Sequence, residues 1–242
     1  MFESVWSFLS LLLEPPWRWV AILALVSAIC AATDMIMRSH PRLRSHHVAY
    51  TVLFWTLPTL IIVMAFVALP LSASGSWITA GAAVAAAMVG LVVFCEYHNI
   101  DPEDKLYDIS RYALNITVYL LAFAFYVTIR QLEMGTFVSV LAAWAVSALL
   151  AVELFREKGK PGVVALYAAV TGLIIGETRW ALFYWATGGV MGGIFLLLLF
   201  YFVTGVTQHY LAGELKNGTV FEFAGVVALG FVLVYFSRLW MR

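Results

Sequence analysis

The sequence predicts an all-α fold, a polytopic bundle of transmembrane helices that forms a single integral membrane domain over residues 1–242. The first observation is composition: 63% of the residues are hydrophobic and 12% are charged, against roughly 45 to 50% and about 25% in a soluble domain. The second is the recurrence of apolar runs of about 20 residues, the length of a helix that crosses a bilayer. These spans use nearly the whole chain and leave no room for a soluble catalytic or nucleic-acid-binding domain.

The predicted elements begin with a short interfacial helix in residues 1–16, because its apolar face is too short to span a membrane and ends at Pro15 and Pro16. About eight spans follow, at residues 17–37, 47–71, 77–97, 112–130, 136–155, 162–185, 188–210 and 220–240. The division between the sixth and seventh depends on a turn near Thr187, Gly188 and Gly189. A different position for that turn gives seven spans.

Loop charge predicts the orientation of these spans in the cell membrane. One side of the predicted topology carries nine basic residues, namely Arg38, Arg42, Arg44, Lys105, Arg111, Arg156, Lys158, Lys160 and Lys216. The positive-inside rule makes this side, which also holds all the histidines, cytoplasmic. The formal net charge is zero, and the absence of a single basic patch argues against a nucleic-acid partner.

Small residues recur every four positions in the sixth span, at Ala168, Gly172 and Gly176, and the series continues outward as Trp180 and Tyr184. Such a stripe lets another helix approach closely, and its alternative role is a groove for a lipophilic ligand. The next span begins with two overlapping GxxxG patterns in residues 188–193. We therefore expect the sixth and seventh helices to pack as a tight hairpin.

Ionisable and polar side chains within apolar sequence are candidate binding residues, because an unpaired charge in lipid costs at least a few kcal/mol. Glu177 and Arg179 are two residues apart and point to different sides of a helix, so each either reaches the interface or contacts a ligand or partner. One face of the fourth span carries Asn115, Tyr119, Tyr126 and Arg130, for interhelical hydrogen bonds or for a pocket. The candidate ligand-binding residues are Glu177, Arg179, Trp180, Tyr184, Asn115 and Tyr119.

A metal site is a separate hypothesis for the cytoplasmic side. Imidazole and carboxylate groups bind Zn²⁺ or iron, and the candidate ligands are Asp34, His47, Glu96, His98 and His209. No HExxH or HxxxH pair supports the site, so the alternative is ordinary loop histidines, helix caps and headgroup contacts.

Three segments of the last third of the chain carry a resemblance to a known family. They are the run GETRWALFYW at 176–185, Thr207 to Tyr210, and Gly213-Glu214-Leu215. Together they resemble a bacterial family of uncharacterised multi-pass membrane proteins. The resemblance implies a shared fold and transfers no catalytic residues.

The sequence therefore predicts a protein without a recognisable catalytic motif. We expect an accessory subunit of a membrane complex or a binder of a lipophilic molecule such as a lipid, a quinone or a carotenoid. Its partners would be membrane lipids and a membrane protein or a second copy of the chain. The alternative is a metal-dependent enzyme that acts on lipid at the cytoplasmic surface, and the third hypothesis is a small transporter.

Overall fold

The computed structural model describes residues 17–41, 52–68, 75–132, 134–184, 189–214 and 221–228, together with residues 218, 230 and 232. This part of the chain is helical and contains no strand, which confirms the predicted all-α class. The chain divides into two compact units, residues 1–117 and 118–242.

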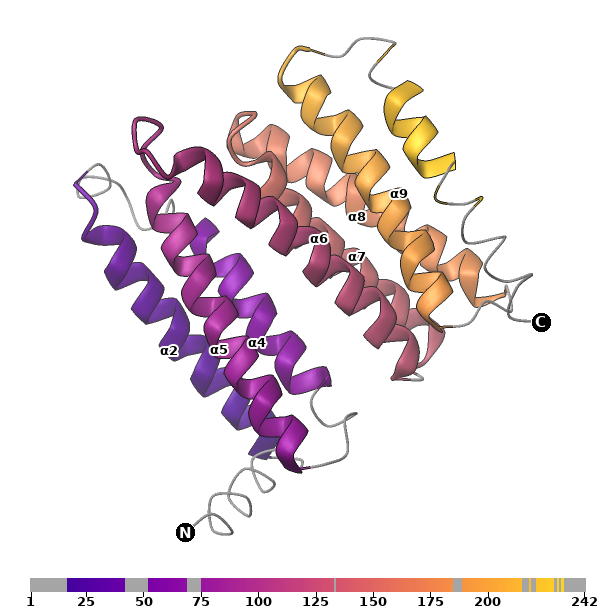
Figure 1. Ribbon diagram of the computed structural model, residues 1–242. Helices are drawn as coiled ribbons and strands as arrows, with labels where there is room; N and C mark the ends of the chain where they lie inside the picture. Colours follow the sequence, from indigo (N-terminus) through magenta and orange to yellow (C-terminus); the bar gives the residue numbers. More distant parts are fainter. Residues whose placement is uncertain are drawn as a thin grey trace. The chain divides into compact units, whose positions relative to one another are not determined.

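Figure 1 shows the described helices in the order of the chain. They are α2 (Trp17–Arg38), the 3₁₀ helix η1 (Val52–Trp55), α4 (Thr56–Ala68), α5 (Gly75–His98), α6 (Tyr107–Gln131), α7 (Thr136–Phe155), α8 (Pro161–Phe183) and α9 (Gly189–Leu211). Within the described residues, α2 and α5 to α9 are long and apolar enough to cross a membrane. The protein therefore has the helices of a multi-pass membrane protein.

Each of these six helices coincides with one of the predicted spans, and the sixth and seventh are separate helices, because α8 ends at Phe183 and α9 begins at Gly189. The predicted span at 220–240 is helical over residues 221–228, and most of its remainder lies outside the described residues. The predicted interfacial segment at 1–16 also lies outside them. The single-domain assignment and the cytoplasmic side stay predictions.

Of the second predicted span, 47–71, the structure describes residues 52–68, in which the α-helix covers Thr56–Ala68. Pro58 lies in its first turn. A proline is tolerated there, but a continuous α-helix entering from upstream would bring the proline ring against the carbonyl of residue 54. The preceding residues Val52–Trp55 accordingly form a 3₁₀ helix instead.

The first unit packs α2, α4 and α5 together. Met37 on α2 and Phe54 on η1 are buried at one end, where Val93, Tyr97 and Ile100 pack against them. Cys30 on α2 lies 3.5 Å from the hydroxyl of Thr59 on α4. This packing fixes one end of α2 against the end of α5.

In the second unit, α7 and α8 form the closest helix pair. A Cβ atom added to Gly172 would lie 2.6 Å from the carbonyl oxygen of Trp144 on α7, and one added to Gly176 would lie 3.3 Å from the Trp144 Cβ. The glycine stripe of α8 is therefore a helix-packing seam, as small residues in membrane helices commonly are.

The closest neighbour of this seam is the preceding helix α7, although α8 also contacts α9 as expected. The GxxxG region of α9 has a third partner: a Cβ atom added to Gly193 would lie 2.6 Å from the Val127 side chain on α6. Both glycine patterns thus mark close approaches. The spacing that reveals such a seam carries no information on which helix fills it.

The end of α9 is a tight reversal at Gly213, whose φ of 71° is strained for other L-residues. The amide of Glu214 donates to the carbonyl of His209 at 3.0 Å, and the amide of Gly213 donates to that of Tyr210 at 3.0 Å. This is a Schellman-type helix end.

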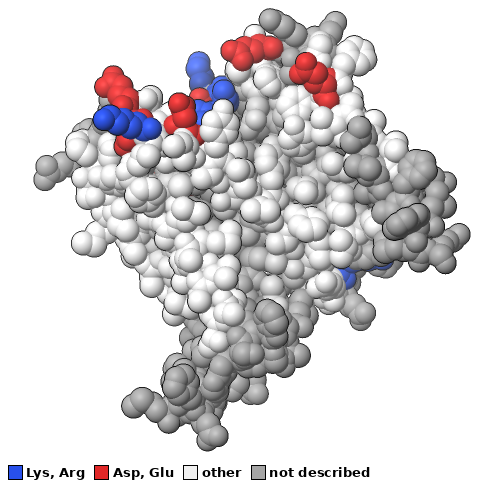
Figure 2. Space-filling model, viewed as in Figure 1, with Lys and Arg blue, Asp and Glu red and all other residues white. Residues whose placement is uncertain are grey.

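The outward faces of the helices are apolar. Large hydrophobic side chains such as Leu23, Phe137 and Leu166 are more than half exposed, a surface suited to lipid. Figure 2 shows the Lys, Arg, Asp and Glu side chains gathered near helix ends, with uncharged flanks on the face in view.

Candidate ligand-binding sites

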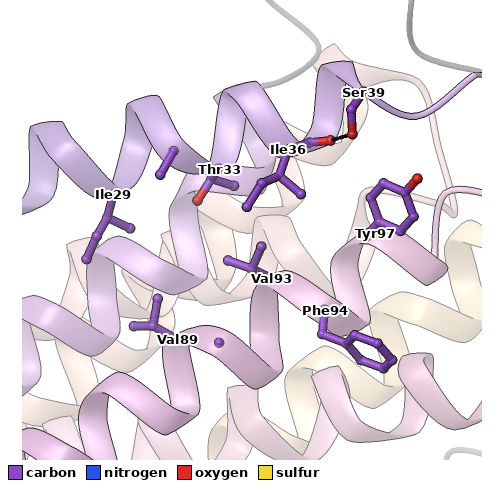
Figure 3. Close-up of a pocket in the computed structure, with 10 residues that line it drawn as sticks. Ile29, Thr33, Ile36, Ser39, Val89, Val93, Phe94 and Tyr97 are labelled. Carbon is purple, nitrogen blue, oxygen red and sulfur yellow. Dashed lines mark hydrogen bonds between the residues drawn. The ribbon is translucent and has the colours of Figure 1, made fainter.

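The first unit holds an apolar groove of about 590 Å³ between α2 and α5. Figure 3 shows Ile29, Thr33 and Ile36 on α2 opposite Val89 and Val93 on α5. The volume falls within the roughly 300 to 1,000 Å³ of typical small-molecule sites.

One end of the groove is polar. Ser39 and Tyr97 line it there, and the Ser39 hydroxyl donates to the carbonyl of Ile36 at 2.6 Å. The His40 ring packs edge-on to Tyr97, with centroids 4.9 Å apart. Nearby on α2, Arg38 Nε donates to Asp34 Oδ2 at 2.6 Å. The groove therefore runs from an apolar region to a polar and charged helix end.

Gly90 explains why the groove is open. Nothing lies within 4 Å of the position that a Cβ atom of residue 90 would occupy, although Gly90 and Ala32 both line the groove. A glycine without a close neighbour leaves empty volume, in contrast to Gly172 in its tight seam.

The structure separates the predicted binding residues of α8. Glu177 is exposed, and so are Trp180 at 54% and Tyr184 at 78%, whereas Arg179 is only 6% exposed. The expectation that Glu177 and Arg179 point to different sides is confirmed. The four residues therefore do not form one contiguous site, and Arg179 alone faces the interior of its unit.

Arg179 lines a small cavity in the second unit. Its neighbours there are Tyr126 and Arg130 of α6, Leu182 of α8, and Gly192 and Leu196 of α9. The cavity has a volume of about 10 Å³, room for one water-sized group. The Arg179 Nε is buried and has no hydrogen-bond partner.

The polar face of α6 serves mainly to join helices. The hydroxyls of Tyr119 and Thr204 on α9 lie 3.2 Å apart, and those of Tyr126 and Ser147 on α7 lie 2.7 Å apart. Ser147 and Thr204 in turn donate to backbone carbonyls of their own helices. Asn115 is half-buried on the same helix. The interhelical hydrogen-bond role is thus confirmed for Tyr119 and Tyr126.

The predicted metal ligands are dispersed over several local environments. Asp34 is ion-paired with Arg38, Glu96 is fully buried, and His98 Nδ1 donates to the carbonyl of Phe94 at 3.0 Å. His209 packs its ring 5.7 Å from that of Phe223, and His47 lies outside the described residues. Among the residues that the structure covers, no group of three or more His, Cys, Asp or Glu could hold a metal ion. The metal site stays a prediction.

Sequence reasoning missed the α2–α5 groove. The available signal was the run of small residues in 81–90, GAAVAAAMVG, facing a helix with Ala32 and Thr33. That run predicts either a close approach or a hollow, and only the position of the opposing backbone decides between them.

A family model described as "Protein of unknown function (DUF5656)" matches residues 7–237. The match extends well beyond the last third on which the resemblance rested. No curated protein and no solved structure matches the chain.

Proposed function

Since the chain belongs to the DUF5656 family, whose function is unknown, we propose from its geometry that it binds a lipophilic molecule within the membrane. The observation that carries this proposal is the α2–α5 groove, with its apolar length and its single polar end.

The lining favours an amphiphile with one apolar tail and one polar head. Isoleucine and valine side chains offer dispersion contacts along the tail. Ser39 and Tyr97 supply hydroxyl groups that orient the head, as a few placed polar groups do in apolar sites. A membrane lipid or a quinone fits this pattern better than a carotenoid hydrocarbon, which has no polar head.

Filling the groove tests the proposal. Gly90→Leu places a side chain in open space, so we expect the helix to remain intact while the groove loses volume. The probe is a lysophosphatidylcholine with a fluorescent acyl tail, titrated against the detergent-purified full chain. We expect saturable binding to the wild type and an affinity at least about tenfold lower for Gly90→Leu, equivalent to about 1.4 kcal/mol.

Val84→Phe is the matched control, because it adds the same number of carbon atoms at an α5 position that is 59% exposed and does not line the groove. Its affinity for the probe should equal that of the wild type. Equal binding by Gly90→Leu and Val84→Phe would refute the groove as the binding site. Absence of saturable binding to the wild type would refute the proposed function itself.

A further inference from the structure

The second unit contains two arginines at one cavity. Arg179 from α8 and Arg130 from α6 both line it, and the positive charge of Arg130 acts on that of Arg179. Arg179 is 94% buried, since only 6% of it is exposed. Burying the Arg179 charge away from water is costly unless an anion lies beside it.

Helix ends offset part of this charge. Arg130 lies in the last turn of α6, and Arg179 lies near the end of α8, which is Phe183. The partial negative charges of these two helix ends favour a cation. The buried Arg179 Nε–H nevertheless makes no hydrogen bond. A guanidinium has five N–H donors and no acceptor atom, so this N–H can be satisfied only by an acceptor that comes close to it.

A third positive feature faces the same cavity. Gly192, which lines it, belongs to the first turn of α9, whose first residue is Gly189. The first amides of a helix have no intrahelical acceptor, and this end carries a partial positive charge that attracts anions. Two guanidinium groups and a helix N-terminus thus surround one small space.

The size of the space identifies the group that enters. About 10 Å³ admits one oxygen atom and excludes a whole phosphate, so the remainder of the anion must stay outside. The exposed Trp180 and Tyr184 near the same end of α8 are residues typical of the headgroup level of a membrane.

We propose that the cavity bounded by Arg179, Arg130 and Gly192 binds a phosphate group through one of its oxygens. The phosphate comes from a phospholipid headgroup or from the free ion. This site is separate from the α2–α5 groove and does not depend on the function proposed for it.

The test compares two lipids with identical acyl chains, phosphatidic acid and diacylglycerol, by native mass spectrometry of the detergent-purified full chain. We expect phosphatidic acid to bind the wild type roughly tenfold more tightly, since a charge-assisted hydrogen bond contributes at least that factor. Arg179→Gln should abolish the preference, and Arg179→Lys, which keeps the charge without the fork, should retain part of it.

Lys160→Gln is the control, because it removes one positive charge from the opposite end of α8. It should preserve the preference for phosphatidic acid. In another outcome the two lipids bind alike, and inorganic phosphate raises the unfolding temperature of the wild type but not that of Arg179→Gln. That outcome would support the site and identify its ligand as the free phosphate ion.

Two results would overturn the proposal. One is a preference for phosphatidic acid that persists in Arg179→Gln, and the other is the absence of any phosphate effect on the wild type.

Discussion

Two glycine-to-alanine substitutions, both within helices, should change stability in opposite directions. In Gly172→Ala the new methyl group would lie 2.6 Å from the Trp144 carbonyl oxygen and 3.0 Å from the Ala148 Cβ. A backbone oxygen cannot move aside as the end of a flexible side chain can, so α7 and α8 must separate. In Gly90→Ala the methyl group would meet no atom within 4 Å.

The magnitudes follow from two terms. Replacing glycine by alanine in a helix stabilises by about 1 kcal/mol, and overpacking a close contact costs about 1 to 3 kcal/mol. Gly90→Ala has only the first term, so we expect it to be up to about 1 kcal/mol more stable than the wild type. Gly172→Ala has both terms, and because the contact is rigid we expect its free energy of unfolding to be up to about 2 kcal/mol lower than that of the wild type.

Thermal unfolding of the detergent-purified proteins measures the difference, which we expect to be on the order of 5 to 10 °C between the two variants. Gly90→Ala is the internal control for the change in helix propensity. A Gly172→Ala protein as stable as Gly90→Ala would refute the reasoning, because it would show that the seam can widen without cost.

Two further substitutions test buried polar contacts of the second unit. Tyr126→Phe removes the hydroxyl that lies 2.7 Å from Ser147 Oγ and should lower the free energy of unfolding by about 0.5 to 1.5 kcal/mol. In a double-mutant cycle, Ser147→Ala should then lower it little further. Full additivity of the two changes would contradict a direct hydrogen bond. Glu153→Gln removes the carboxylate charge that Arg156 contacts at 3.1 Å, with both side chains at most 8% exposed. We expect a loss of about 3 to 5 kcal/mol that Arg156→Met largely restores when combined with it, whereas equal unfolding temperatures for Glu153→Gln and the wild type would exclude a structural role for the pair.

The sequence predicts the long apolar helices of this fold well, because the requirement to cross lipid sets their length and composition. A span must be long and apolar, so composition located α7 at Thr136–Phe155 and the other long helices within a few residues. Pro58 shortened α4 because the proline ring excludes continuous α-helix on its upstream side. The sequence shows the proline, but it does not show that Phe54 packs against Met37.

The candidate sites were less predictable, because they depend on which helices are neighbours. Gly90 and Gly172 look alike in sequence, and one opens a groove while the other closes a seam. The apolar sequence around Arg179 identified it as a candidate residue. That Arg179 is buried while Trp180 and Tyr184 are exposed depends on how α8 is oriented about its axis, which the sequence does not show. Helical spacing places residues on faces and leaves open which face turns inward.

The α7–α8 seam also bears on how the chain would leave a membrane under mechanical load. Its two backbones touch at Gly172, so neither helix can slide without dragging the other. By contrast, the Leu154 carbonyl of α7 accepts a hydrogen bond from Gln208 Nε2 of α9 at 3.1 Å, a bond that a short displacement breaks. A pull on the carboxyl terminus would therefore extract residues 221–228 and then α9, and α8 and α7 would follow as a single step in the force trace.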